Sequence, residues 1–291
     1  MKANRSARLW FTEMETLSTA RSFGGTQGVY RHDSTACGVP MTFAVYLPPQ
    51  AEAGPVPVLW YLSGLTCTHQ NVMDKGEYRA AAARHGMAIV CPDTSPRGAG
   101  VPDEPDNWQM GCGAGFYLDA TQEPWSRNYR MATYIRDELA ALVAQHFPVD
   151  LTRQGIFGHS MGGHGALTLA LREPARFRSV SAFAPIVQPS TAAWSRPAFE
   201  KYLGPDEAAW RKYDATLLIE DGHCVPEILV DQGTADSFLE TGLRPQLLKQ
   251  VCDKAGIALT LNMREGYDHS YFFISTFMAD HVAWHAGRLR G

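Results

Sequence analysis

The sequence predicts an α/β fold in which a mostly parallel central sheet is covered by helices on both faces. Short apolar runs of strand length alternate with longer segments of helical periodicity, which favours parallel strands joined by crossover helices. A turn-rich hairpin comes before this alternation, and polar, glycine-containing loops follow several of the apolar runs. We therefore expect an N-terminal antiparallel hairpin next to a parallel sheet whose polar residues gather at one edge.

The hairpin is expected over residues 23–47. Val29-Tyr30 and residues 41–47 are strand-like, and they enclose a turn-rich stretch over 33–40. Pro48-Pro49 ends the second strand, because proline has no N–H to donate to a sheet.

The first parallel crossover is expected directly after the hairpin. Residues 56–62 form an apolar strand, and residues 63–68 follow as a polar loop. Residues 71–85 predict one helix with an alanine-rich core and Gly86 as its C-terminal stop. The next buried strand is predicted over residues 87–91, so the unit reads as a right-handed parallel crossover.

A long irregular segment interrupts the pattern over residues 94–126. It is rich in Pro, Gly, Asp and aromatic residues, and loops of this length in compact domains are usually functional or disordered. The aromatic content argues against disorder. Helical periodicity returns over residues 130–147.

The second half of the chain continues the alternation. We expect another strand, a mixed loop and short-helix region, two further strands and a closing amphipathic helix, in the order 180–186, 188–224, 227–230, 259–263 and 271–289.

The composition limits the number of domains and the kinds of partner that we expect. The 291 residues are 45% hydrophobic and 19% charged, which suits a single globular domain over residues 14–291. Lys and Arg total 26 against 30 Asp and Glu, a net charge of −4, and no basic run is present, so we expect no nucleic-acid partner. No apolar run approaches the roughly 18 residues of a membrane-spanning helix.

The first 13 residues are expected to be an extension outside the domain. They are basic but lack the apolar core of a secretory signal. Met14 is a second possible start, so the stretch is either a disordered extension or a product of start-site assignment. The six cysteines form no C-x-x-C pair and no zinc-like spacing, which favours reduced thiols in a cytoplasm and no metal site.

The central motif is Gly158-His159-Ser160-Met161-Gly162, which follows an apolar run and leads into a helix start rich in small residues. This is the context of a nucleophile elbow, in which Ser160 is the nucleophile. Glycine at 158 and 162 lets neighbouring backbone pass closely around the turn. The N–H groups and the positive end of the helix dipole would stabilise an oxyanion there.

A base and an acid are expected to complete a catalytic triad. His269 is the candidate base, because it lies in a loop after the last strand, whereas His159 and His164 are too close in sequence to turn back onto Ser160. The order serine, acid, histidine is that of the α/β-hydrolase fold. Asp231 and Asp236 are both candidate acids; we favour Asp236, which lies in the loop beyond Gly233.

The oxyanion hole is expected to use two backbone N–H groups. One belongs to Met161, which follows the nucleophile, and the other comes from the loop after residues 56–62, where Leu65 is the candidate. Cys67 lies two residues further on, either near the site or as an inert buried thiol.

Several segments of the chain resemble the S-formylglutathione hydrolases, the esterase D family, from about Met14 to Leu289. These segments are more specific than G-x-S-x-G alone, and they are residues 23–27, 61–68, 92–98, 113–117, 157–167, 213–216 and 266–271. The chain departs from the family pattern in the leader before Met14 and over residues 220–226.

The resemblance implies a cytoplasmic, cofactor-free thioesterase, commonly a homodimer, that hydrolyses S-formylglutathione to glutathione and formate in formaldehyde detoxification. By motif position its triad falls on Ser160, Asp236 and His269, with Leu65 and Met161 as oxyanion donors. Two rivals are a general short-chain carboxylesterase or acyltransferase on the same fold and a non-catalytic hydrolase-like binding protein. For the substrate pocket we expect residues that the loops carry toward the site, namely Cys67, Arg97, Trp108, Trp125 and Trp194.

Overall fold

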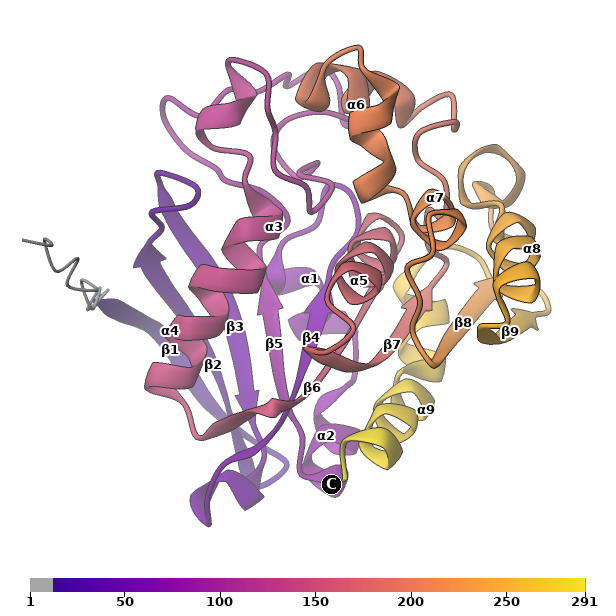
Figure 1. Cartoon of the computed structure of the whole chain (residues 1–291). Helices are drawn as coiled ribbons and strands as arrows, with labels where there is room; N and C mark the ends of the chain where they lie inside the picture. Colours follow the sequence, from indigo (N-terminus) through magenta and orange to yellow (C-terminus); the bar gives the residue numbers. More distant parts are fainter. Residues whose placement is uncertain (1–12, 291) are drawn as a thin grey trace, which may run out of the picture.

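The computed structural model describes residues 13–290, so the predicted extension over residues 1–13 lies almost entirely outside the described part of the chain. Nine strands form one sheet in the order β1-β2-β3-β5-β4-β6-β7-β8-β9. The pairs from β1 to β5 are antiparallel, and those from β5 through β4 to β9 are parallel (Figure 1). The α/β class and the mostly parallel sheet predicted from the sequence are confirmed.

The hairpin is confirmed, and it carries one more strand than expected. β2 (Gly25–Asp33) pairs antiparallel with β3 (Pro40–Leu47), and β1 (Met14–Ser22) adds to the outer edge of β2. Most of β1 is exposed and its sequence is largely polar, so it has no alternation of buried and exposed residues that would mark a strand. Pairing with β2 alone makes it a strand.

The first crossover has the expected strands but two helices in place of one. β4 (Val56–Leu62) and β5 (Ala88–Pro92) are parallel neighbours. Between them, α1 (His69–Lys75) and α2 (Arg79–His85) are separated at Glu77, whose φ of 53° is left-handed and breaks the helix. The prediction of one helix over 71–85 was wrong for this reason.

The long irregular segment is confirmed. Within residues 93–124 the structure has no helix or strand, and only the short 3-10 turn η2 (Trp125–Arg127) precedes the next helix. That helix consists of α3 (Met131–Thr133), the π-helical stretch η3 (Tyr134–Leu139) and α4 (Ala140–His146). It covers the range in which helical periodicity was predicted.

The strand and helix on either side of the central motif are β6 (Val149–His159) and α5 (Met161–Arg172). The next strand, β7 (Phe177–Phe183), begins and ends three residues earlier than predicted. It ends there because Ala184 has a φ of 43°, which is incompatible with an extended strand, and Pro185 follows.

The remaining elements follow the predicted order, with α8 as an unexpected helix. They are η1 (Pro49–Glu52), α6 (Arg196–Leu203), η4 (Glu207–Tyr213), α7 (Ala215–Glu220), β8 (Glu227–Gly233), η5 (Leu239–Leu243), α8 (Pro245–Ala255), β9 (Ala258–Arg264) and α9 (Tyr271–Leu289). α8 has ordinary helix signals, with Pro245 in its first turn and Gly256 in a left-handed conformation after its end.

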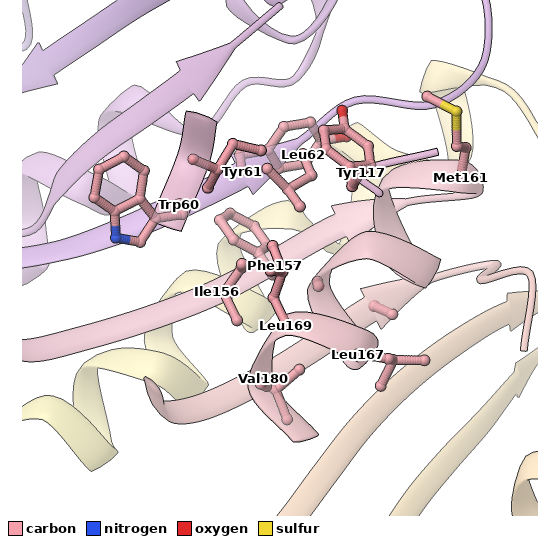
Figure 2. Packing of buried hydrophobic residues seen from close by; sticks show 14 of the residues in the cluster. Trp60, Tyr61, Leu62, Tyr117, Ile156, Phe157, Met161, Leu167, Leu169 and Val180 are labelled. Atoms are coloured by element: carbon pink, nitrogen blue, oxygen red, sulfur yellow. The ribbon is translucent and has the colours of Figure 1, made fainter. Parts of the chain in front are cut away.

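Helices cover both faces of the sheet. The Ser181 side chain on β7 bonds to His281 and His285 of α9, whereas a Cβ at Gly163 of α5 would lie 3.3 Å from the Cβ of Ala182. Since successive side chains of a strand point to opposite faces, α5 and α9 lie on opposite sides of β7. Buried side chains of β4, β6, β7 and α5 pack into the core under the central motif (Figure 2).

Among residues 13–290, no helix has both the length and the apolar character needed to span a bilayer.

Candidate active site

Ser160 lies in the sharp turn between β6 and α5. Its φ of 58° and ψ of −118° are a strained combination for a residue with a side chain, and such strain persists only when the surroundings hold it. The Ser160 N–H donates to the carbonyl of Phe183 at 2.9 Å, and its own carbonyl accepts from the N–H of His164 at 2.9 Å. The turn is thus fixed both by β7 and by the first turn of α5.

The two glycines of the motif are required by close backbone contacts. A Cβ at Gly158 would lie 2.5 Å from the backbone of Gly162, and one at Gly162 would lie 1.9 Å from the carbonyl oxygen of Leu62. No real Cβ tolerates such distances, so the prediction that glycine lets the chain pass here is confirmed.

His269 and Asp236 lie side by side in the loops that follow β9 and β8. Nδ1 of His269 is 2.6 Å from Oδ2 of Asp236, and the Asp236 side chain is fully buried. The Phe238 N–H donates to Oδ1 of the same carboxylate at 2.8 Å, and the Gln232 side-chain amide donates to Oδ2 at 3.2 Å. These donors fix the carboxylate in the orientation in which it accepts from the imidazole.

The other candidate acid has different partners. Asp231, on β8, accepts from the side chains of Asn262 at 2.7 Å and Arg264 at 2.9 Å, both on β9. It is fully buried and faces His281 of α9, with 3.8 Å between Oδ2 and Nε2. Asp231 therefore ties β8 to its neighbours, while Asp236 faces His269.

Ser160 and His269 line the same cavity, which has a volume of about 420 Å³. Within residues 13–290 no hydrogen bond joins the serine hydroxyl to the imidazole; such contacts often shorten only when substrate binds. The structure thus brings all three predicted triad residues to one place, and their catalytic roles stay a prediction.

The two predicted oxyanion donors also flank the serine. Met161 is the first residue of α5, and Leu65 lines the cavity next to Gly64, where an added Cβ would lie 3.2 Å from the Cβ of Ser160. Neither Leu65 N–H nor Met161 N–H donates to a carbonyl in the described part of the chain. Both are thus free to donate to an oxygen atom beside Ser160.

Hydrogen bonds hold the loop that carries Leu65. The Thr66 N–H donates to the Gly113 carbonyl at 2.9 Å, and the Cys67 carbonyl accepts from Arg97 Nη2 at 3.0 Å and from the Thr94 hydroxyl. These bonds connect the loop after β4 to two places in the long irregular segment that follows β5, at residues 94–97 and at Gly113. The position of Leu65 is therefore set by the irregular segment as well as by its own loop.

Three of the five predicted pocket residues line the cavity: Cys67, Trp108 and Trp194. The rings of Trp108 and Trp194 are 6.0 Å apart and form an aromatic wall. Burial raises the pKa of the Cys67 thiol, so it is mostly protonated at neutral pH.

Arg97 and Trp125 do not line the cavity, and their prediction as pocket residues is corrected. Arg97 is turned inward to the Asp93 carboxylate, with both contacts at 3.0 Å, and to the Cys67 carbonyl. Trp125 is buried against Tyr129 and Tyr202. Sequence position on a long loop does not say which of its side chains turn inward.

The cavity also has lining residues that were not singled out from the sequence. Phe238, Leu243 and Tyr271 contribute side chains to it. Gly64 and Thr66 also line it, and they belong to the loop over residues 63–68 that carries Leu65, here called the oxyanion loop. Phe238 follows the predicted acid by two residues and Tyr271 follows the predicted base by two, so closeness to the triad in sequence is the signal that would have found them.

Two rings hold the imidazole of His269 besides Asp236. The Phe238 ring lies edge-on at 5.1 Å between centroids, and the His159 ring lies at 4.3 Å. His159 is buried, and burial together with the neighbouring His269 holds the pKa of His159 well below its usual range. This pair of rings was not foreseen from the sequence.

No group of three or more His, Cys, Asp or Glu side chains in the described structure is arranged to hold a metal ion.

Comparisons with known proteins agree on one family. Residues 34–284 match the family model described as "Putative esterase". The S-formylglutathione hydrolase of Paracoccus denitrificans is 55% identical over 275 residues, which are 94% of this chain and 98% of the relative. The mouse S-formylglutathione hydrolase is 51% identical over 276 residues, 94% of this chain and 98% of its own.

Solved structures extend the agreement to the fold. The S-formylglutathione hydrolase of Agrobacterium tumefaciens is 64% identical, with a TM-score of 0.94 over 94% of this chain and 99% of that chain. A fluorophosphonate-binding serine hydrolase of Staphylococcus aureus, 18% identical, has a TM-score of 0.71 over 90% of this chain and 98% of its own. The fold is thus the α/β-hydrolase fold that the order serine, acid, histidine predicted.

Proposed function

The chain belongs to the S-formylglutathione hydrolase family, and from that premise we propose that it hydrolyses S-formylglutathione to glutathione and formate through Ser160, His269 and Asp236. The observation that carries the proposal is the 2.6 Å contact between His269 Nδ1 and buried Asp236 at the cavity that holds Ser160. A serine, an imidazole and a buried carboxylate in this order are the parts of nucleophilic acyl transfer.

In the first half of the reaction, Ser160 attacks the formyl carbon of the thioester. Nε2 of His269 accepts the hydroxyl proton, while Asp236 holds the Nδ1–H and stabilises the imidazolium that forms. The carbonyl oxygen becomes an oxyanion, which accepts hydrogen bonds from the N–H groups of Leu65 and Met161. Collapse of this intermediate breaks the C–S bond, and His269 returns the proton to the departing glutathione sulfur.

In the second half, water replaces the thiol. His269 takes a proton from the water as it attacks the formyl carbon on Ser160, and a second oxyanion forms in the same place. Collapse breaks the bond to the Ser160 oxygen, which regains its proton from His269. Formic acid leaves and loses its proton to the solvent to become formate, and the serine is ready for another turnover.

The cavity suits the reacting end of the substrate better than its charged ends. No Asp, Glu, Lys or Arg side chain of residues 13–290 lines it, and Trp108, Trp194, Phe238 and Leu243 make most of it apolar. Placing a carboxylate or an ammonium there without a partner would cost free energy. In the proposed complex the formyl thioester enters the cavity, and the charged ends of the glutathionyl part lie outside it.

The metabolic role, the cellular location and the oligomeric state are part of the same proposal. Hydrolysis of S-formylglutathione would place the protein in formaldehyde detoxification, in the cytoplasm, without a cofactor and as a homodimer, as the family resemblance implies. Light scattering of the purified protein tests the dimer.

A second candidate, a general short-chain carboxylesterase or acyltransferase, is favoured by one observation. The cavity of about 420 Å³ with its aromatic wall has room for acyl or alcohol groups larger than formyl. Steady-state kinetics distinguish the two. A higher kcat/KM for S-formylglutathione than for simple oxygen esters supports the proposal, and the opposite order supports the esterase.

A third possibility, a non-catalytic binding protein, has a direct test. We expect the wild type to hydrolyse an activated ester and Ser160→Ala to be inactive. Equal background rates for both proteins would contradict every hydrolase assignment.

A further inference from the structure

His159 is the buried side chain of the site that the mechanism above does not use. It precedes the nucleophile, it is 6% exposed, and its ring lies 4.3 Å from the ring of His269 at an angle of 47°. Among residues 13–290, neither of its ring nitrogens has a hydrogen-bond partner, and both are sealed from solvent. Leaving a buried polar group unpaired costs free energy, so the fold keeps this ring here at a cost.

The surroundings of the His159 ring hold it in one place. A Cβ at Gly64 would lie 3.1 Å from Nδ1 of His159, so the oxyanion loop closes one edge of the ring. The ring of Tyr271 lies 6.4 Å away, on the side of α9. His159 is therefore held between the oxyanion loop and the ring of the proposed base.

The ring of His269 needs such support because Asp236 fixes it at one atom only. A single hydrogen bond at Nδ1 leaves the imidazole free to rock about that contact, which would move Nε2 relative to Ser160. Phe238 and His159 pack against the imidazole and limit this motion. A misplacement of about 1 Å at a reacting atom costs on the order of 100-fold in rate.

The absence of charge on His159 also suits its position beside His269. His269 becomes a cation during each proton transfer, and a second cation in contact with it would oppose that step. Burial and the neighbouring His269 hold the pKa of His159 well below its usual range, so the ring stays neutral. A neutral five-membered ring fits against both Gly64 and the imidazole.

We propose that His159 is a positioning residue, whose neutral imidazole holds the ring of His269 in the orientation in which Nε2 faces Ser160. This inference rests on the proposed serine hydrolase mechanism, but not on the identity of the thiol or the acyl group. It predicts that His159 acts mainly on kcat. His159 is among the residues that line the cavity, but both of its ring nitrogens are sealed from solvent, so it holds the base and offers the substrate no polar contact.

The test compares two histidines of the same segment. His164 is also buried and neutral, with a pKa of about 4, but its Nε2 lies 3.0 Å from the Phe116 carbonyl. We expect His159→Gln to lower kcat by about 10-fold to 100-fold with KM little changed. His164→Gln, which keeps an amide near the Phe116 carbonyl, should leave both constants near those of the wild type.

Both S-formylglutathione and an activated aryl ester should be assayed. If the glutathione thioester is not the substrate, the ester still reports the loss of kcat, so the two proposals fail separately. A folded His159→Gln or His159→Asn protein with wild-type kcat, or a loss confined to KM, would overturn the positioning role.

A measurement on the unchanged protein covers the case in which neither variant folds. In histidine-labelled wild-type protein, NMR between about pH 5 and 8 should show His159 neutral throughout. Its ring protons should give cross-peaks to the imidazole that is bonded to Asp236. Titration of His159 in that range, or the absence of those cross-peaks, would also refute the proposal.

Discussion

The carboxylate of Asp236 faces Nδ1 of His269 at 2.6 Å, while Asp231, five residues earlier, accepts from Asn262 and Arg264. Two aspartates that the sequence leaves as alternatives are thus given different surroundings by the fold.

Asp236→Asn should lower kcat by about 10⁴, because the amide favours the wrong imidazole tautomer and cannot stabilise the imidazolium. Asp231→Asn should chiefly lower the free energy of unfolding, since it loses its ion pair with Arg264. Steady-state kinetics and urea unfolding of both folded variants check this. The reverse ranking would mean that Asp231 is the acid.

Cys67 should be a point at which a bulky reagent blocks the cavity. It lines the cavity, and burial raises its thiol pKa, so N-ethylmaleimide should inactivate the enzyme slowly at neutral pH and faster as the pH rises. Cys67→Ser should stay active and become resistant. Cys224→Ser is the control, because Cys224 is exposed and lies outside the cavity lining. A folded but inactive Cys67→Ser would instead give the thiol a chemical role.

The acyl group and the glutathionyl group of the substrate should contribute separately to kcat/KM. Contacts to the glutathionyl part position the formyl carbon, so truncating that part should lower kcat as well as raise KM. Each methylene added to the acyl group should cost about 1–3 kcal/mol in kcat/KM. We expect the order S-formyl, S-acetyl and longer S-acylglutathiones, with simple aryl esters well below the first. Faster turnover of butyryl or longer esters would favour the general esterase.

Gly162→Ala should destabilise the protein by about 3 kcal/mol or more, at the upper end of overpacking effects, because the new methyl group would meet the Leu62 carbonyl at 1.9 Å. Gly287→Ala is the matched control, since nothing lies within 4 Å of a Cβ there. Gly287 is an exposed position of α9, where alanine stabilises a helix by up to about 1 kcal/mol. Equal unfolding free energies for the two variants would disprove the close passage.

Buried histidines should make the protein less stable as the pH falls. Burial lowers the pKa of His164 to about 4 and that of His285 well below its usual range, so the folded state binds fewer protons than the unfolded state. The pKa of a histidine in the unfolded chain is about 6.5. Above that pH these histidines do not reduce the free energy of unfolding, and below it the free energy of unfolding falls as the pH falls. For His164 the loss is about 1.4 kcal/mol per pH unit, down to a pH of about 4.

Urea unfolding at several values between pH 7 and 4.5 measures this slope. His164→Gln should reduce it, because that variant no longer has the histidine to protonate. A free energy of unfolding that does not change over this range would contradict the neutral state of these buried rings.

Local sequence patterns determined several elements of this fold and the turn around the nucleophile. The apolar strand over residues 56–62 and the closing helix over 271–289 have the predicted bounds, since each combines a strong periodicity with a clear end signal. The elbow around Ser160 also follows from local sequence, because only glycine fits beside it at positions 158 and 162.

Elements and contacts that depend on distant partners could be decided only by the tertiary structure. β1 is a strand because β2 pairs with it, and the left-handed residue Glu77 divides a stretch with helical periodicity. In the same way, the direction in which a loop side chain turns depends on what packs around it. Arg97 is held by Asp93 and a backbone carbonyl, away from the cavity.

The candidate active site likewise depends partly on local sequence and partly on tertiary contacts. The sequence by itself determined the residue types, their order and their places after the strands, because a nucleophile elbow and parallel strands impose local spacing. Only the tertiary structure decided that Asp236 faces His269 and that the rings of His159 and Phe238 enclose it. These contacts join residues up to 110 positions apart, such as His159 and His269, and such distances in sequence carry no periodic signal.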